Sequence, residues 1–193
     1  TRDELYKILN DLNCFGRIYI ATEGINAQMN VPENNWDEFV KQLYDNPYFK
    51  DVPFKMAVDN NGKSFYKLVI KVKQNIVADG INDKNFNASD TGKYLNAKEF
   101  NAAIEDPNTI VIDMRNHYES EVGHFDRAFC PDADTFREEL PLVIEHLKGK
   151  EDKKVVMYCT GGIRCVKASA YFKFKGFKDV HHLHGGIIQY AQE

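Results

Sequence analysis

Apolar and polar residues alternate along the chain in two different ways, one in each half. In the first half, Leu5, Ile8 and Leu9 recur at helical spacing, whereas residues 25–31 alternate between apolar and polar, as a half-buried strand does. A hairpin-type turn is predicted at residues 60–62. The pattern predicts the order helix, strand, strand, helix, strand, strand over residues 3–13, 17–21, 25–31, 36–43, 54–58 and 65–72.

This order is that of an α+β, ferredoxin-like (split βαβ) domain without its first strand, so we expect the natural protein to be longer at its N-terminus. In the second half strands alternate with helices, which predicts an α/β domain with a parallel sheet covered on both faces. Its strands are predicted at residues 109–113, 155–158 and 180–183, and its helices at 96–104, 116–121, 134–147 (with a break at Pro141), 163–175 and after Gly186. Residues 78–95, rich in Asn, Asp, Gly and Ser, are predicted to be a linker between domains at 1–77 and 96–193.

The stretch most informative about chemistry is residues 155–165, where a buried strand leads through a turn into a helix. Cys159 ends the strand, and Gly161 and Gly162 allow a backbone turn that larger residues would block. A cysteine at a helix N-terminus meets free N–H groups and the positive end of the helix dipole, which lower the pKa of its thiol. We therefore predict that Cys159 is a nucleophile and that Arg164 stabilises its negative charge, within a loop formed by Thr160, Gly161, Gly162 and Ile163.

The spacing of this loop indicates which anion it suits. In protein tyrosine phosphatases the arginine stands one residue further from the cysteine than Arg164 does here, and that larger loop encloses a phosphate. The smaller loop suits a sulfur atom carried on cysteine and resembles the active site of a rhodanese. A buried structural cysteine is the alternative interpretation, but the two glycines and Arg164 favour an anion cradle.

Several other side chains are candidates near this loop. Asp113 and Arg115 end a neighbouring strand, where an ion pair that shapes the loop is a simpler interpretation than catalysis. His184 is a third candidate neighbour, and it shares a strand face with His182. No cysteine or carboxylate accompanies these histidines at ligand spacing, so no metal site is predicted. Cys165 is expected only to pack its helix against the core, with its sulfur directed away from Cys159. The alternative is that Cys165 is a resolving thiol for oxidised Cys159.

Lysines form two basic groups in a chain whose net charge is −4. Lys67, Lys71 and Lys73 share one strand face, with Lys63 and Tyr66 nearby; a solvated face is the simpler interpretation and a phosphate-contacting stripe the functional one. The second group lies on the helix after Cys159 and its exit, where Arg164 accompanies Lys167, Lys173, Lys175 and Lys178. A solvated face explains this group adequately, and its place beside the cysteine suits a polyanionic substrate. The predicted nucleic-acid contacts are Lys67, Lys71, Lys73, Lys167 and Lys173.

The composition narrows the class of protein. An apolar share of 43% in 193 residues is enough for packed cores. Four scattered cysteines without paired spacing favour a reducing, cytoplasmic location. No apolar run approaches the ~20 residues of a membrane helix, so no membrane association is expected. No glycine-rich nucleotide fingerprint, iron triad or flavin motif is visible, so the sequence itself indicates no cofactor.

The motifs of both halves together resemble the bacterial tRNA uridine hydroxylase family, whose members carry a rhodanese domain. The resemblance covers nearly the whole chain and rests on residues 15–17, 22–28, 62–65, 76–80, 113–119, 123–124, 159–164 and 184–187. It implies oxygen-dependent hydroxylation of the wobble uridine of tRNA, with molecular oxygen as co-substrate and Cys159 as the essential cysteine, carrying a persulfide. The chain departs from the family at Val166, where a glutamate is usual, and at Cys130, where an apolar residue is usual.

Other functions compete with this expectation. A persulfide sulfurtransferase, which would need a sulfur donor as a partner, fits the isolated loop equally well. A phosphatase is disfavoured by the length of the loop, and a non-catalytic tRNA- or protein-binding module is disfavoured by the intact cysteine. The leading prediction is a tRNA-modifying oxidoreductase.

Overall fold

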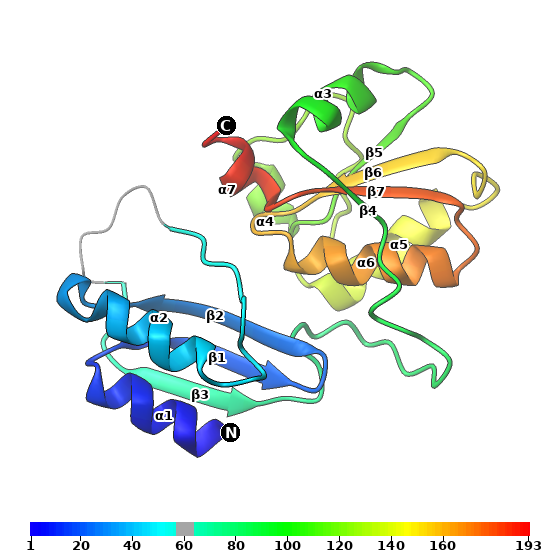
Figure 1. Ribbon diagram of the computed structural model, residues 1–193. Coiled ribbons are helices and arrows are strands. Elements are labelled where there is room, and N and C mark those ends of the chain that lie inside the picture. The colour runs from blue at the N-terminus through cyan, green and yellow to red at the C-terminus, as the bar shows by residue number, and fades with distance from the viewer. Residues whose placement is uncertain (57–63) are drawn as a thin grey trace. The chain divides into compact units, whose positions relative to one another are not determined.

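A computed structural model of the protein describes residues 1–56 and 64–193 (Figure 1). The chain divides into two compact units, Thr1–Ile76 and Val77–Glu193. The predicted turn at 60–62, the end of the predicted strand 54–58 and Lys63 lie outside the described residues.

The first unit is a three-stranded sheet with helices on one face. Its strands lie in the order β2-β1-β3, with β1 antiparallel to β2 and parallel to β3. The elements are α1 (Arg2–Asp11), β1 (Phe15–Ala21), β2 (Gly24–Asn30), the 3-10 helix η1 (Glu33–Asn35), α2 (Trp36–Tyr44) and β3 (Leu68–Val72). The ferredoxin-like domain expected from the sequence is thus represented by a mixed sheet in which β3 lies directly beside β1.

The two faces of this sheet differ in character because successive strand residues point to opposite sides. Ile18 of β1 and Ile70 of β3 face the helices and are buried with Leu9 of α1 and Phe39 of α2. Burial of each such side chain stabilises the fold by roughly 1.5–3 kcal/mol. The intervening positions, which include Arg17 in β1, are on the other face of the sheet.

The strand predicted at 54–58 does not form over its described residues. Instead, the Phe54 ring packs against Trp36 and Phe39 of α2, at centroid distances of 5.2 and 5.5 Å, and stacks on Tyr44 at 5.5 Å. The alternating pattern of this stretch therefore reflects an aromatic cluster over α2 rather than strand pairing.

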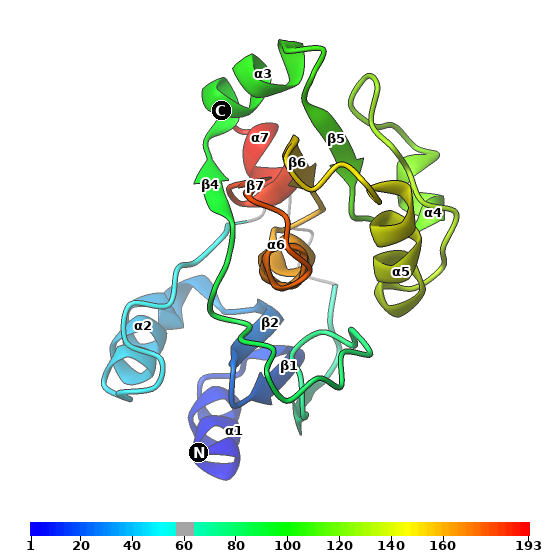
Figure 2. The same ribbon diagram turned by 90° about the vertical axis from the view of Figure 1, so that its right-hand side faces the viewer.

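The second unit is a four-stranded parallel sheet covered on both faces, as predicted (Figure 2). The strand order is β4-β7-β6-β5, and helices α5 and α6 cover one face while α3 and α7 cover the other. The elements are β4 (Lys93–Leu95), α3 (Ala97–Glu105), β5 (Ile110–Asp113), α4 (His117–Ser120), α5 (Phe136–His146), β6 (Lys154–Tyr158), α6 (Ile163–Phe174), β7 (Asp179–Leu183) and α7 (Gly186–Tyr190).

Two parts of this unit differ from the sequence prediction. Helix α5 runs without a break through Pro141, because the buried side chains of Phe136, Leu140 and Val143 hold both halves of the helix against the core. Residues 79–92, expected to belong to a free linker, pack along α6.

This segment, which we call the α6 strap (residues 79–92), makes three kinds of contact with α6. The Gly92 N–H donates to Ser169 Oγ at 2.9 Å, and Lys167 Nζ lies 3.0 Å from a carboxylate oxygen of Asp79. The ring of Phe86 packs edge-on against aromatic rings of the same helix. Polar and aromatic residues of the strap therefore attach it to α6 through a hydrogen bond, an ion pair and ring contacts.

Candidate active site around Cys159

Cys159 stands where the central strand β6 ends and helix α6 is about to begin. Gly162, the residue before α6, has a φ of +96°, a left-handed conformation that suits glycine. This turn brings the main chain of the loop around the cysteine. The strand end and the helix start are thus joined as the sequence predicts.

The sulfur of Cys159 is buried within hydrogen-bond donors. Its exposed fraction is 1%, and the Gly162 N–H donates to Sγ at 3.1 Å. The main-chain N–H and the thiol of Cys165 also form hydrogen bonds with this sulfur. The surroundings are therefore a polar cradle inside an apolar core, and not apolar packing alone.

The charge state of Cys159 follows from opposing contributions. Burial raises the pKa of the thiol, but the Cys165 thiol, the Arg164 charge and the N–H groups of the loop together lower the pKa to about 6. At neutral pH the sulfur is consequently a thiolate, the nucleophilic form of cysteine.

The sulfur of Cys165 was expected to be directed away from Cys159, but it is directed towards it. It is fully buried in the first turn of α6, and its side chain hydrogen-bonds to Cys159. Burial and this hydrogen bond to the thiolate raise the pKa of Cys165 well above its ordinary value. Cys165 is thus a neutral thiol that donates to an anionic one.

Arg164 is held in place by a carboxylate that the sequence analysis did not select. Its guanidinium donates to the two Glu119 oxygens at 2.7 and 3.0 Å, and to Thr160 Oγ1 at 2.8 Å. Burial raises the pKa of Glu119, yet the Arg164 and Thr160 hydrogen bonds outweigh it and leave that pKa below its usual value. The capping box that Glu119 forms with Asn116 at the start of α4 is a sequence signal that could have identified it.

Asp113 and Arg115 form a buried ion pair at the end of β5. Arg115 Nη2 lies 2.7 Å from Asp113 Oδ2 and 2.6 Å from the Gly123 carbonyl oxygen. The Tyr158 hydroxyl donates to the same Asp113 oxygen at 2.8 Å. These contacts join the ends of β5 and β6 and so fix the strand from which Cys159 follows.

The last strand reaches the loop through a glycine and not through His184. His184 is exposed and packs edge-on against Tyr94 at 5.7 Å, whereas Cys159 is buried. By contrast, a Cβ at Gly186 would meet the carbonyl oxygens of Cys159 and Thr160 at 2.4 and 2.5 Å. The main chain of α7 therefore closes one side of the loop.

The predicted tRNA-contacting lysines have different environments. Lys67, Lys71 and Lys73 are exposed on β3 and its flanks. Lys167 is buried and ion-paired with Asp79, because its position on α6 faces the strap; that it contacts a phosphate stays a prediction. Lys173 is partly exposed and forms an ion pair with Asp90 of the strap.

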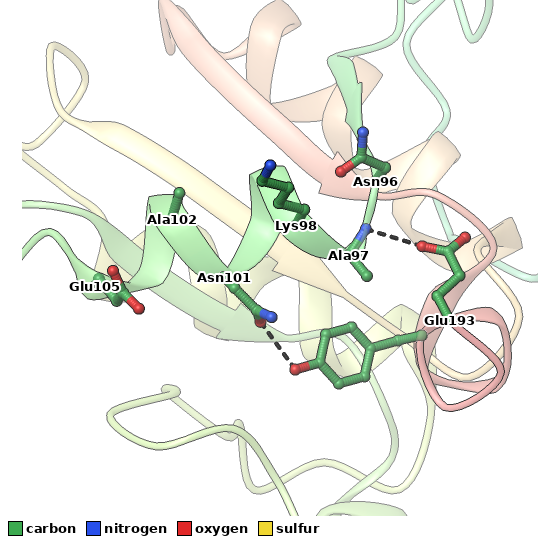
Figure 3. Close-up of a pocket in the computed structure, with 8 residues that line it drawn as sticks. Asn96, Ala97, Lys98, Asn101, Ala102, Glu105 and Glu193 are labelled. Carbon is green, nitrogen blue, oxygen red and sulfur yellow. Dashed lines mark hydrogen bonds between the residues drawn. The ribbon is translucent and has the colours of Figure 1, made fainter.

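A surface hollow between α3 and α7 lies apart from this chemistry (Figure 3). Two hydrogen bonds join residues that line it: Tyr190 donates to Asn101 at 2.8 Å and the Ala97 N–H donates to Glu193 at 3.2 Å. No cysteine or histidine lines it. Over residues 1–56 and 64–193, no cluster of potential ligands could hold a metal ion, and no helix could cross a membrane.

Comparison with protein families places this geometry in a known group. Residues 96–193, about half of the chain, match the rhodanese-like domain family, and residues 1–76 match the UPF0176 acylphosphatase like domain. The chain belongs to the rhodanese-like domain family. In its rhodanese domain, Cys159 is on the loop after the central strand, at the carboxyl ends of parallel strands, where ligands bind in open α/β sheets.

Curated relatives match over both domains. The chain is 57% identical over 192 residues to the tRNA uridine(34) hydroxylase of Leptospira interrogans, with 100% of this chain and 52% of that protein covered. It is 55% identical over 194 residues to the tRNA uridine(34) hydroxylase of Escherichia fergusonii, with 100% of this chain and 55% of that protein covered. The chain therefore spans about half the length of the curated relatives it matches.

Proposed function

We propose that this chain is part of an enzyme that hydroxylates carbon 5 of the wobble uridine, position 34, of tRNA, and that Cys159 is its reactive group. The names and 55–57% identity of the relatives support the reaction class. The observation that carries the role of Cys159 is its environment: a buried thiol whose pKa is about 6, in a cradle of donors at a helix N-terminus.

Each neighbour of the thiolate has a separate task in this proposal. Arg164 balances the negative charge of Cys159, and Glu119 holds the guanidinium in one orientation through two hydrogen bonds. The Gly162 N–H and the Cys165 thiol donate to the sulfur directly. Together they keep Cys159 ionised without contact with bulk water.

Molecular oxygen is the co-substrate in this proposal. Replacing the C5–H bond by a C5–OH bond takes up one oxygen atom of O₂, and the other leaves as water with two electrons from a reductant. The chain's own contribution is the thiolate and the closed loop around it. The tRNA substrate and the four free cysteines are consistent with action in the reducing cytoplasm.

The open face of the first unit's sheet is the proposed tRNA surface. Lys67, Lys71 and Lys73 project from it, and the ammonium of Lys73 lies 5.6 Å from the ring centre of Tyr19 on the adjacent strand. Arg17 shares this face. Cations beside an aromatic ring suit a nucleic acid, since the cations contact phosphates and the ring stacks on bases.

The role of Cys159 is tested by mass spectrometry of wobble uridines. A strain deleted for the gene is complemented with the full-length protein carrying Cys159→Ser or, as a matched control, Cys130→Ser. We expect the hydroxylated uridine to be lost with the first variant and retained with the second. Hydroxylated uridine at the normal level with Cys159→Ser would rule out this role.

A persulfide sulfurtransferase is the second candidate, favoured by the rhodanese-like domain and the small loop. The Cys159 thiolate would attack the outer sulfur of thiosulfate, forming an S–S bond as sulfite leaves, and would then pass that sulfur to an acceptor thiol or cyanide. Fast thiosulfate:cyanide turnover by the purified full-length protein, absent in Cys159→Ser, would support this alternative.

A further inference from the structure

Glu139 is a carboxyl group placed where the fold calls for an apolar side chain. It lies on the inward stripe of α5, beside Phe136, Leu140 and Val143, and its side chain is fully buried. Acidic residues are almost never fully buried unless they are paired. Glu139 therefore requires a physical explanation.

Both carboxyl oxygens of Glu139 are buried without a hydrogen-bond partner among the described residues. An ionised carboxylate in such a place is strongly disfavoured, so a buried acid without partners keeps its proton. In agreement, burial raises the pKa of Glu139 to about 9. At neutral pH it is a carboxylic acid whose O–H has no acceptor among these residues.

The charged groups around Glu139 are those of the Cys159 site. The positive charge of Arg164 lowers the pKa of Glu139, while the negative charges of Asp113, Cys159 and Glu119 raise it. These groups come from β5, α4, the loop after β6 and α6. The thiols of Cys165 and Cys130 also respond to the charge of Glu139.

The packing agrees with this placement. Phe136, Leu140 and Val143, the neighbours of Glu139 on its helix stripe, belong to the same buried cluster as Cys159 and Cys165. The carboxyl group and the reactive sulfur are thus enclosed in one core, where water does not screen the interaction between their charges.

We propose that Glu139 belongs to the Cys159 site as its proton-holding residue: its buried, unpartnered carboxyl group keeps a proton while Cys159 carries a negative charge, and it can release that proton when the sulfur loses its charge by forming a bond. The inference rests on the reactive role proposed for Cys159. The negative charges of the two groups repel each other, and the one guanidinium of Arg164 is already paired with Glu119, so ionisation of either group disfavours ionisation of the other. Glu139 acts through this field as a positioning residue and not as a group that contacts substrate.

The proton on Glu139 can be observed directly by infrared difference spectroscopy. Wild type minus Glu139→Gln should show the carbonyl stretch of a buried carboxylic acid at neutral pH, and the band should disappear near pH 9, where Glu139 ionises. In Cys159→Ser the same band should disappear at lower pH, because the negative charge that raises the pKa of Glu139 has gone. A residue with only a packing role would not make this band depend on Cys159.

The reciprocal measurement is alkylation of Cys159 by iodoacetamide, in which an S–C bond forms and iodide leaves with the negative charge. Trypsin cuts after Lys154 and Arg164, so the peptide 155–164 contains Cys159 without Cys165. The wild-type alkylation rate should rise near pH 6, as Cys159 ionises. It should rise a second time as Glu139 ionises, because the new negative charge raises the pKa of Cys159 and makes its thiolate about threefold more reactive for each pKa unit. Glu139→Gln should retain the first rise and lose the second.

Two further variants keep the test decisive. Glu138→Gln alters an exposed neighbour on the same helix and should behave as wild type in both measurements. Glu139→Asp keeps a titrating group and should retain a second rise. Absence of the carboxylic acid band, an unchanged band titration in Cys159→Ser, or a second rise that persists in Glu139→Gln would each overturn the proposal. Absence of the first rise would instead count against the reactive role of Cys159 itself.

Discussion

At the scale of single residues, the site is a set of charges whose protonation states depend on one another. Cys159 is ionised although it is buried, and Glu139 is neutral although it is an acid. Arg164 and the hydrogen bonds of the loop explain the first, while missing partners explain the second. The two protonation states differ because hydrogen-bond donors reach the sulfur of Cys159, whereas none from the described residues reaches the carboxyl oxygens of Glu139.

Removing the positive charge of Arg164 should raise the pKa of Cys159. Because Arg164 is among the groups that lower this pKa to about 6, we expect Arg164→Gln to raise it towards its ordinary value of about 8.5. Arg164→Lys keeps the charge but loses the two-pronged bond to Glu119, so its shift should be smaller. The pH dependence of Cys159 alkylation measures both, and an unchanged profile in Arg164→Gln would contradict the role given to this charge.

The buried acid should also make stability fall as pH rises. The pKa of Glu139 is about 9 in the folded protein against an ordinary value near 4.5, so between these pH values the unfolded chain releases a proton that the folded chain keeps. The contribution of Glu139 to the free energy of unfolding therefore falls over this window, by about 1.4 kcal/mol per pH unit. Above pH 6 the lowered pKa of Cys159 contributes in the opposite direction, so the effect of Glu139 is seen as a difference between variants.

Glu139→Met removes this titration and should become progressively more stable than wild type between pH 5 and 8. Urea unfolding at several pH values measures the difference, with Glu138→Gln as the control. A difference that does not change with pH would contradict a buried neutral acid.

Only part of this residue-scale picture could be predicted from the sequence. The strand, the glycines and the spacing of Arg164 identified Cys159 because they are adjacent in the chain. Glu119 and Glu139 reach the same site from α4 and α5, and no local spacing connects them to Cys159. A glutamate on the apolar stripe of α5 was the available signal for Glu139.

At the scale of elements, α7 closes the cysteine loop through main-chain contacts. The Ile187 N–H donates to the Cys159 carbonyl oxygen at 2.9 Å and the Ile188 N–H donates to that of Thr160 at 3.2 Å. Gly186 permits this approach, with a φ of +67° and no side chain between the two backbones.

Gly186→Ala should therefore disturb the site as well as the fold. The added Cβ would have to displace two carbonyl oxygens, and we expect a loss of stability of several kcal/mol with slower alkylation of Cys159 at pH 7. Gly149→Ala is the matched control, because Gly149 has a similar φ of +76° but open space around its Cβ position. Equal effects of the two substitutions on alkylation would show that backbone strain alone is responsible.

Elements with a clear period were predictable, and elements fixed by distant contacts were not. Helix α1 and strand β2 follow their apolar spacing closely. The short strand β4 and the α6 strap lie in a polar stretch whose partners are far along the chain, at β7 and α6. Phe54 alternates as a strand residue would but belongs to an aromatic cluster.

At the scale of the whole molecule, each unit has its own core, and each contributes a different property to the proposed enzyme. The rhodanese domain supplies the thiolate, and the first unit supplies a basic, partly aromatic sheet face. If this face holds tRNA, affinity and chemistry should be separable by mutation.

The substitution Lys67→Glu with Lys71→Glu should weaken tRNA binding by the full-length protein and reduce its salt dependence. Each lost phosphate contact lowers the salt slope by about one. Lys7→Glu is the control, because Lys7 is exposed on α1, which packs on the opposite face of the sheet. Filter binding across a salt series measures the effect, and Cys159 alkylation should stay unchanged. Equal losses from Lys7→Glu would point to overall charge instead of this face.

The α6 strap has a mechanical consequence. Asp79 is ion-paired with Lys167, and Gly92 is hydrogen-bonded to Ser169, so the strap is attached to α6 at both of its ends. A force applied to the chain at Ile76 would therefore act on the helix that carries Arg164 and Cys165, without a flexible linker to extend first. In a single-molecule stretching experiment, tension entering from the first unit would therefore be felt at the cysteine loop early. The first residues of the second unit would thus transmit force to helix α6.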